Sequence, residues 1–423
     1  MLNIGIIGVG TVGESVIKIL KENRDIISAR AGKEIRVLKA AVRDLSKKRD
    51  VDVPLTDNAD EILDDPSIDV VVELMGGIEE AYRIVSKALK NGKGVVTANK
   101  ALLAYHRYEL QNLAKDLPFG FEASVAGGIP IINALKVGLS ANHIESLKGI
   151  MNGTCNFILT KMMNEGSDFK ETLKEAQDLG YAEADPTFDI GGFDAAHKLL
   201  ILASIAYGID AKPEDILIEG IENINAEDIA FAKEFNYSIK LLAIAKKVDH
   251  KVELRVHPVL IKKDQMIAKV DGVMNGISVI GDRVGETMYY GPGAGGDATA
   301  SAVISDLIEI ARVGKGSPML GFKRAMESSN LTLMPRSEII SKYYLRMCVY
   351  DRPGVLASIA KVFEKYDISI NAVLQRPTNE ESQKASLLFS THLCKEEMIQ
   401  KALDEIESLE SVSSRPAMIR IEE

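Results

Sequence analysis

Cysteine is scarce in this sequence, and its few residues are scattered. The three cysteines, Cys155, Cys348 and Cys394, lie far apart, and none belongs to a CxxC pair or a cluster of histidines. Structural zinc sites require such clusters, so the spacing disfavours structural zinc. An odd number of dispersed thiols fits a reducing compartment, and we expect a cytoplasmic protein.

A basic excess and long apolar runs are also lacking. The chain has 51 lysine and arginine residues against 61 aspartate and glutamate residues, which gives a formal net charge of −10. This balance disfavours nucleic acid and anionic membranes as partners. No segment approaches the roughly 18 uncharged apolar residues that a membrane helix needs. Because the first residues run directly into a strand pattern, we expect no export signal and no domain fused ahead of it.

What the sequence has is an ordinary globular composition and a regular rhythm of elements. Its 423 residues are 46% hydrophobic and 26% charged, enough for about two to four domains. In the first third, apolar runs alternate with helical patterns, which predicts an α/β fold with a doubly wound parallel sheet of the Rossmann type over residues 1–134. The expected strands are residues 3–7, 35–42, 69–74, 94–98 and 119–125.

The pattern changes in the middle of the chain, where we expect a mixed α+β domain over residues 135–297. The expected helices are residues 169–179, 194–207 and 226–248, and the expected strands lie near 252–261 and 268–280. A glycine-rich turn at 291–296 precedes a further helix at about 298–313. The segment 298–318 is expected to return to the first domain.

The end of the chain has its own order of elements. Residues 319–341 are predicted to be a linker, and residues 342–423 a separate domain. Its expected elements are a strand at 343–350, a helix at 355–365, strands at 369–375 and 384–391, a helix at 396–409 and a strand at 417–421. This order is that of a ferredoxin-like βαββαβ unit.

A glycine-rich motif, GVGTVG at residues 8–13, follows the first apolar strand and opens a helix. In this context the motif predicts a dinucleotide site, because glycines permit a tight turn and the helix N-terminus attracts phosphate. The alternative is an ordinary glycine-rich turn. The residues expected to contact the cofactor are Gly8, Gly10, Thr11, Val12 and Gly13.

The choice of cofactor depends on the end of the second strand. An NAD site usually places a carboxylate there, whereas this chain has Arg43. The planar guanidinium of arginine suits a 2′-phosphate, and Lys47 or Lys48 would add charge, so we expect NADP. Two alternatives remain: the basic loop is simply solvated, or Asp44 binds a ribose and NAD is used.

Carboxylates are dense between residues 180 and 198. Asp194 and Lys198 are four residues apart at the start of an apolar helix, and therefore lie on one face. From spacing alone, the simpler interpretation is a helix-capping aspartate with an ion pair along the helix. The functional interpretation is a site for a cationic group.

Four segments together resemble homoserine dehydrogenases. They are residues 97–104, 149–156, 180–198 and 292–299, in that family's order, and the likeness covers about residues 1–320. The resemblance implies a monofunctional enzyme that interconverts L-homoserine and L-aspartate 4-semialdehyde with NADP(H), in the biosynthesis of threonine, methionine and isoleucine. Two other function classes remain: a non-catalytic nucleotide and amino-acid sensor, and a related oxidoreductase acting on another amino-acid aldehyde.

The resemblance also implies that residues 135–297 form the substrate-binding and dimerisation domain, and it implies roles for particular residues. Lys198 is the acid/base for the reacting oxygen, and Glu183 and Asp194 hold the amino-acid end of the substrate. Lys100 contacts cofactor and substrate and stabilises negative charge at the reacting oxygen. Further implied contacts are Gly180 and Gly295 near the nicotinamide, and a sodium ion held by the backbone carbonyls of Glu122, Val125, Gly127 and Ile129.

Two residues are not assigned to catalysis. His197 is adjacent to Lys198, but neighbouring helical positions point about 100° apart, so we interpret it as a packing or polar-network histidine. Cys155 has no histidine near it in the sequence, and we expect an inert thiol.

The last domain resembles ACT domains through residues 350–356, which include Pro353 and Gly354, and residues 368–375. The resemblance implies an amino-acid effector, with L-threonine as the first candidate, in a pocket usually completed by a second copy. We therefore expect a homodimer or homotetramer. The alternative is an ACT domain that serves only for dimerisation.

Overall fold

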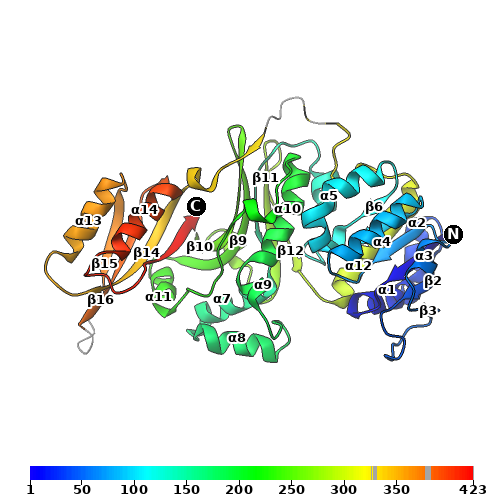
Figure 1. The fold of residues 1–423 in the computed structure, drawn as a ribbon, viewed down its shortest axis with the longest axis horizontal. Helices are drawn as coiled ribbons and strands as arrows, with labels where there is room; N and C mark the ends of the chain where they lie inside the picture. Colours follow the sequence, from blue (N-terminus) through cyan, green and yellow to red (C-terminus); the bar gives the residue numbers. More distant parts are fainter. Residues whose placement is uncertain (325, 327–330, 377–382, 423) are drawn as a thin grey trace. The chain divides into compact units, whose positions relative to one another are not determined.

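The computed structural model describes residues 1–324, 326, 331–376 and 383–422 (Figure 1). By contacts the chain divides into two units. The first comprises Met1–Gly153, Asp194–Asp215 and Val273–Leu331, and the second comprises Thr154–Phe193, Ile216–Gly272 and Thr332–Glu423. Each unit is therefore assembled from segments that are distant in the sequence.

The first unit contains a parallel sheet in the order β3-β2-β1-β4-β5-β6. Its strands are β1 (Leu2–Ile7), β2 (Ile35–Ala41), β3 (Leu55–Thr56), β4 (Val70–Glu73), β5 (Gly94–Thr97) and β6 (Phe119–Gly120). The central strands are almost entirely buried, as expected where helices cover both faces. The predicted doubly wound α/β sheet is confirmed.

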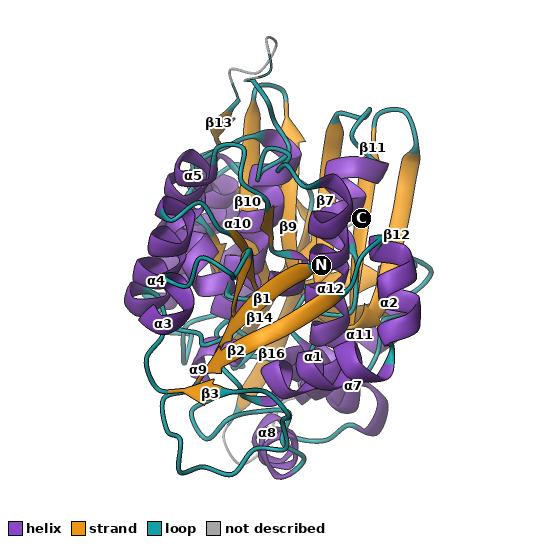
Figure 2. Cartoon of the chain, turned by 90° about the vertical axis from the view of Figure 1, so that its right-hand side faces the viewer, coloured by secondary structure: helices purple, strands orange, loops and turns teal. Residues whose placement is uncertain are grey.

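Helices lie on both faces of this sheet. They are α1 (Thr11–Glu22), α2 (Arg24–Ala31), α3 (Asp60–Leu63), α4 (Glu79–Lys90), α5 (Lys100–Ala114) and α12 (Gly296–Val313). Figure 2 shows α1, α2 and α12 on one side of β1 and β2, and α3, α4 and α5 on the other. Although α12 is remote in sequence, its Ala300, Val303 and Leu307 are buried in the same core as Val16 of α1.

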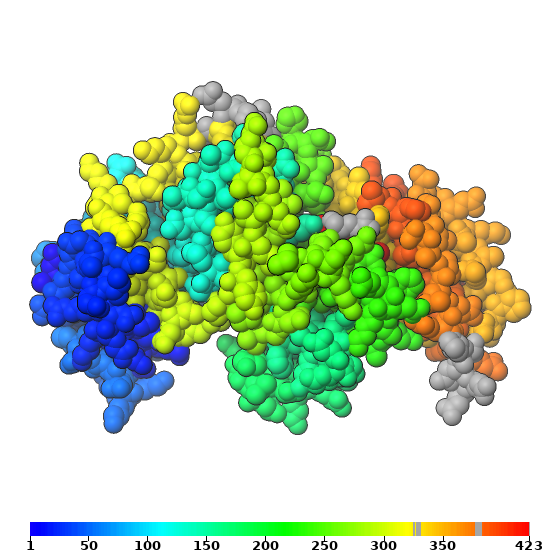
Figure 3. Space-filling view, turned by 180° about the vertical axis from the view of Figure 1, so that it is seen from behind, coloured from blue at the N-terminus to red at the C-terminus, as the bar shows by residue number. Residues whose placement is uncertain are grey.

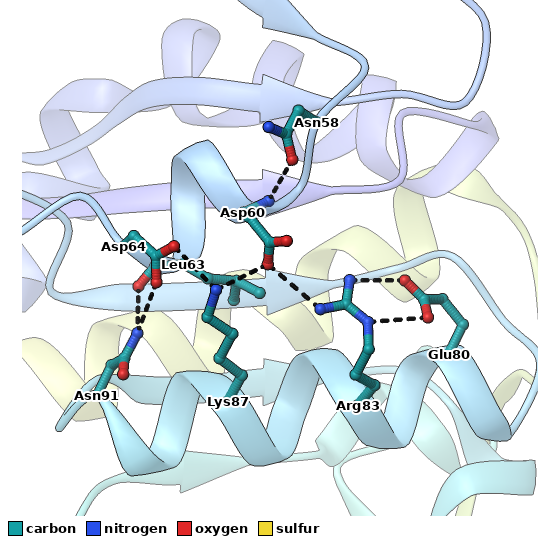
Figure 4. Close-up of polar contacts among 8 residues, drawn as sticks. All are labelled: Asn58, Asp60, Leu63, Asp64, Glu80, Arg83, Lys87 and Asn91. Carbon is teal, nitrogen blue, oxygen red and sulfur yellow. Dashed lines mark hydrogen bonds and ion pairs between the residues drawn. The ribbon is translucent and has the colours of Figure 1, made fainter.

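Side chains on the surface join α3 to α4 (Figure 4). The carboxylate of Asp60 accepts hydrogen bonds from Arg83 at 3.2 Å and from Lys87 at 2.9 Å. Lys87 also donates to Asp64, and Arg83 to Glu80. Because the side chains of these pairs are partly exposed to solvent, we expect each pair to contribute little to the stability of the fold.

The rest of the first unit follows the parallel sheet. Its elements are the short helices η1 (Glu122–Ser124), α6 (Ile131–Asn133) and η2 (Ala134–Gly138), the strands β7 (Ile144–Ile150), β11 (Met274–Gly281) and β12 (Gly285–Pro292), most of helix α10 (Phe193–Tyr207), and η3 (Pro213–Asp215). The strands form an antiparallel ladder in the order β12-β11-β7.

The second unit has a sheet in the order β9-β10-β18-β14-β16-β15. Its strands are β8 (Leu217–Ile218), β9 (Tyr237–Val248), β10 (Lys251–Lys262), β13 (Thr332–Leu333), β14 (Ile340–Tyr350), β15 (Ile370–Gln375), β16 (Lys384–Thr391), β17 (Cys394–Lys395) and β18 (Ala417–Glu422). Its helices are α7 (Gly153–Glu165), α8 (Phe169–Asp178), α9 (Thr187–Ile190), α11 (Ala226–Glu234), η4 (Ile267–Lys269), η5 (Arg336–Glu338), α13 (Val355–Lys365) and α14 (Glu396–Glu407).

The ferredoxin-like order predicted for the end of the chain is confirmed. Strands β14, β15, β16 and β18 and helices α13 and α14 share one core, which includes Phe363 and Phe389. In Figure 3 this segment forms a continuous orange-to-red surface. Residue 423, where the expected domain ends, lies outside the described residues. Residues 325 and 327–330 of the linker expected at 319–341 also lie outside them.

Three expectations for single elements are wrong. The helix expected over 226–248 ends at Glu234, and a strand, β9, follows from Tyr237. Asn236 lies just after this end and has a left-handed backbone, with φ of 60°, so the helix cannot continue through it. The strand expected over 119–125 stops at Gly120, and the strand expected over 268–280 begins only at Met274, after η4.

No helix in the described part of the chain is long and apolar enough to cross a membrane.

Candidate active site

The glycine-rich loop between β1 and α1 has the geometry of a phosphate cradle. Gly8 has φ of +104°, and a Cβ there would lie 2.6 Å from the backbone of Leu74. A Cβ on Gly13 would lie 2.4 Å from the carbonyl oxygen of Gly8. By contrast, a Cβ on Gly10, the N-cap of α1, would meet no protein atom within 4 Å. Gly8 and Gly13 therefore shape the turn, and Gly10 leaves space in front of the helix N-terminus.

The loop after β2 is held by an arginine that the sequence did not single out. Arg49 donates hydrogen bonds to the carbonyl oxygen of Val9 in the glycine-rich loop, at 3.1 Å, and to those of Asp44 and Lys47. Arg43 is exposed. Arg49 thus orders the loop that carries Arg43.

Lys100 is held at the carboxyl edge of the sheet by a capping network. The side chain of Asn99 caps α5 by accepting a hydrogen bond from the amide of Leu102 at 3.0 Å. The amide of Asn99 donates to Thr97, whose hydroxyl donates to the buried carboxylate of Glu73 at 2.6 Å. Burial raises the pKa of Glu73, and these hydrogen bonds oppose the shift. The network fixes the start of α5 and therefore the position of Lys100, its first residue.

Two lysines converge on one buried aspartate. Asp194, near the start of α10, is only 2% exposed and forms ion pairs with Lys198 at 2.8 Å and with Lys100. Lys198 is 9% exposed and also donates to the carbonyl oxygen of Met151 at 2.6 Å. The side-chain amide of Asn152 donates to Asp194 at 3.0 Å. Residues from three of the four motifs noted in the sequence therefore meet at Asp194.

The electrostatics of this cluster favour the ionised carboxylate. Burial alone raises the pKa of Asp194, but the charges of Lys198 and Lys100 and their hydrogen bonds outweigh it and lower the pKa below its ordinary value. Asp194 therefore remains an anion at neutral pH between two ammonium groups.

A buried arginine joins the two helices that carry these lysines. Arg107 of α5 is 2% exposed and donates to the hydroxyl of Ser204 on α10 at 2.6 Å. It also donates to the carbonyl oxygen of Ala211, just beyond that helix. These contacts hold α5 against α10, and the packing of the two helices places Lys100 beside Asp194. An isolated arginine in a helical pattern gives no such signal in the sequence.

The fourth motif begins α12. Gly295 is the N-cap of α12 with φ of +117°, a conformation that favours glycine. A Cβ on Gly296 would lie 2.7 Å from the hydroxyl oxygen of Ser15 on α1. The N-terminus of α12 therefore lies beside that of α1.

Gly180 and Glu183 belong to the second unit. They lie on the exposed loop that follows α8, where Gly180 has φ of +75° and the carbonyl oxygen of Glu183 accepts a hydrogen bond from Gln177. Their expected contacts with nicotinamide and substrate stay predictions.

The loop of residues 122–130 is turned by successive residues with positive φ, Ala126 at +52° and Gly127 at +24°. Among the described residues, no donor forms a hydrogen bond with the carbonyl oxygen of Val125 or Gly127. The carbonyl oxygen of Ile129 accepts from the amide of Ile131. Carbonyls without donors suit a hard cation, so two of the four expected sodium ligands, Val125 and Gly127, are available to one.

Comparison with known proteins decides the family. Family models described as "Homoserine dehydrogenase, NAD binding domain", "Homoserine dehydrogenase" and "ACT domain" match residues 8–119, 130–308 and 343–411. A homoserine dehydrogenase of Helicobacter pylori is 58% identical over 100% of this chain and 99% of its own length. The chain belongs to the homoserine dehydrogenase family.

Solved structures of this family have the same fold. A homoserine dehydrogenase from Thiobacillus denitrificans is 45% identical and covers 100% of this chain and 98% of its own, with a TM-score of 0.92. A hyperthermophilic archaeal homoserine dehydrogenase in complex with NADPH is 31% identical, with a TM-score of 0.62, and covers 73% of this chain and 97% of its own. The chain is thus an NAD(P)-dependent oxidoreductase acting on a CH–OH group.

Two other polar groups belong to the same motifs, His197 on α10 and Cys155 on α7. His197 is buried and makes an edge-to-face contact with Tyr105 at 5.7 Å between ring centroids, and burial lowers its pKa, so it is neutral at pH 7. Cys155 is buried in the second unit, where its thiol donates to the carbonyl oxygen of Asp189. Neither observation gives these residues a catalytic role.

Proposed function

We propose that this homoserine dehydrogenase prefers NADP(H) and that Lys198 is its acid/base. In the reducing direction, hydride passes from the nicotinamide to the aldehyde carbon of L-aspartate 4-semialdehyde, and the ammonium of Lys198 gives a proton to the developing alkoxide. In the oxidising direction, the amine takes the proton of the L-homoserine hydroxyl as hydride leaves. The observation that supports this proposal is the buried ammonium of Lys198, held between Asp194 and the Met151 carbonyl.

The other residues are assigned supporting roles. Lys100 stabilises negative charge at the reacting oxygen, while Asp194 and Glu183 bind the substrate ammonium. Gly180 and Gly295 approach the nicotinamide. A sodium ion on the carbonyls of Glu122, Val125, Gly127 and Ile129 would neutralise charge and stiffen the loop. A non-catalytic sensor is not retained, because the likeness to dehydrogenases covers the whole chain.

The cofactor preference rests on Arg43. A charge-assisted pair between Arg43 and the 2′-phosphate contributes about 1.5–3 kcal/mol, so Arg43→Ala should lower kcat/KM for NADPH by about 10- to 100-fold. The value for NADH should change little, because NADH lacks that phosphate. The measurement is the oxidation of each cofactor at 340 nm with the semialdehyde. Arg36→Ala, which removes an exposed arginine at the start of β2, is the matched control. An unchanged NADPH-to-NADH ratio in Arg43→Ala would refute the assignment.

We further propose that the ACT domain provides feedback control by L-threonine, as suits an enzyme of threonine, methionine and isoleucine biosynthesis. Strand β18 of the ACT domain pairs in parallel with β10. Its buried Arg420 forms ion pairs with Glu219 at 2.7 Å and with Glu396. These bonds connect the effector domain to the rest of the second unit.

Threonine should lower the rate of the full-length enzyme, and L-lysine at the same concentration should not. The physical reason is that an effector must bind two states of the protein with different affinity in order to shift the rate. Initial rates at 340 nm and sedimentation velocity, which also reports the proposed homodimer or homotetramer, are the measurements. If threonine leaves both rate and sedimentation unchanged, regulation by threonine is excluded.

The cytoplasmic location is also a proposal. It is supported by the scattered cysteines, among which the structure shows no disulfide in the described chain.

A further inference from the structure

The first unit contains a cavity of about 400 Å³ that includes none of the residues assigned to cofactor or catalysis, apart from the side chain of Glu122. This volume lies within the range of small-molecule sites, roughly 300–1,000 Å³. The walls come from β6 and the loop after it, from η2, and from the second half of α12 with the residues that follow it.

The carboxyl groups of Glu122, Asp306 and Glu309 line the cavity. Glu122 is buried, and both of its oxygens are occupied by the amides of Ile132 at 2.8 Å and Asn133 at 2.7 Å. Asp306 of α12 accepts one hydrogen bond, from the amide of Glu122 at 2.9 Å. Among the described residues, its other carboxyl oxygen has no hydrogen-bond partner. Asp306 therefore offers an acceptor to the cavity.

An ammonium group also lines the cavity. The Nζ of Lys136 lies 5.3 Å from the centre of the Phe121 ring. In the part of the chain that the structure describes, no ion pair within 4.0 Å joins Lys136 to Asp306 or Glu122. Arg30, Arg312 and Lys315 add positive charge to the lining. The cavity thus presents an acceptor and a cation that are not in direct contact with each other.

Asp306 and Lys136 are both half-buried, so each is only partly solvated. A ligand that placed an opposite charge beside each of them would recover part of this desolvation cost.

We propose that this cavity is a second ligand site that takes a free α-amino acid, whose ammonium contacts Asp306 and whose carboxylate contacts Lys136. A simple anion would face the carboxyls of Asp306 and Glu122, and a simple cation would face Lys136 and the arginines. A zwitterion can contact both Asp306 and Lys136. The site shares no residue with the ACT domain or with the cluster around Asp194, and only Glu122, a proposed sodium ligand, is common to it and to the function proposed above.

Isothermal titration of the full-length protein at pH 7, without nucleotide, tests the site with glycine, L-threonine, L-methionine and L-lysine as probes. At least one should bind, and both Lys136→Met and Asp306→Asn should weaken that binding by about tenfold or more. Lys33→Met, an exposed lysine of the same unit outside the cavity, should bind as the wild type does. Thermal unfolding of each variant verifies that it is folded.

Binding at the ACT domain or the catalytic cluster would be indifferent to both substitutions. Absence of binding across the four probes, or unaltered binding in either variant, overturns the proposal.

Discussion

Replacement of Lys198 by alanine should lower kcat by about 10²–10⁴-fold, the contribution of a positioned general acid/base. The substitution removes the ammonium that donates to Asp194 and to the Met151 carbonyl. Lys100 and the side-chain amide of Asn152, which also contact Asp194, remain. NADPH binding should persist, because the glycine-rich loop belongs to β1 and α1. Steady-state rates at 340 nm and a fluorescence titration with NADPH separate the two effects.

The matched control is Lys90→Ala, which removes an exposed lysine at the end of α4. It should leave kcat unchanged. A Lys198→Ala enzyme with near-normal kcat would refute the acid/base role, and loss of NADPH binding together with kcat would indicate a structural role instead.

Replacement of Asp194 by asparagine should lower kcat/KM for L-homoserine by about 10²–10³-fold. Breaking a buried ion pair typically costs about 3–5 kcal/mol, and here one carboxylate serves two ammonium groups. The neutral amide leaves Lys100 and Lys198 close together without an anion, and it also removes the proposed partner of the substrate ammonium.

The pH profile distinguishes this loss from simple misfolding. Without the anion, the ammonium of Lys198 gives up its proton more readily, so neutral amine is present at lower pH. The acid limb of homoserine oxidation should therefore move to lower pH in Asp194→Asn. Asp116→Asn, which removes an exposed carboxylate of the same unit, should keep the wild-type profile. If Asp194→Asn lowered the rate by the same factor at every pH and left the acid limb in place, the proposed electrostatic role would be contradicted.

Much of the fold follows from local pattern. The parallel sheet and the βαββαβ order are predictable because each element is short, apolar and bounded by turn residues. The helix expected over 226–248 is wrong for two reasons. The buried run of β9, which includes Ile239 and Ile244, has no clear alternation of apolar and polar residues. The boundary between helix and strand depends on the left-handed backbone of Asn236. A run buried on both faces has no period that separates strand from helix.

The site was predictable to a different degree. Asp194 and Lys198 are adjacent on one helical face, so the sequence places them together. Their meeting with Lys100 depends on the packing of α5 against α10, which Arg107 secures through partners about 100 residues away. Likewise, Arg49 and Glu73 act through contacts that arise only once the sheet has formed. Non-local contacts of this kind leave no periodic trace in the sequence.

The most direct test of the proposed mechanism is a crystal structure of the enzyme with NADPH and L-homoserine, a pair that cannot react. The Nζ of Lys198 should lie within about 3.2 Å of the homoserine hydroxyl oxygen, on the side facing the nicotinamide. A complex in which that nitrogen is turned away from the hydroxyl, with another group donating to it, would contradict the assignment of Lys198.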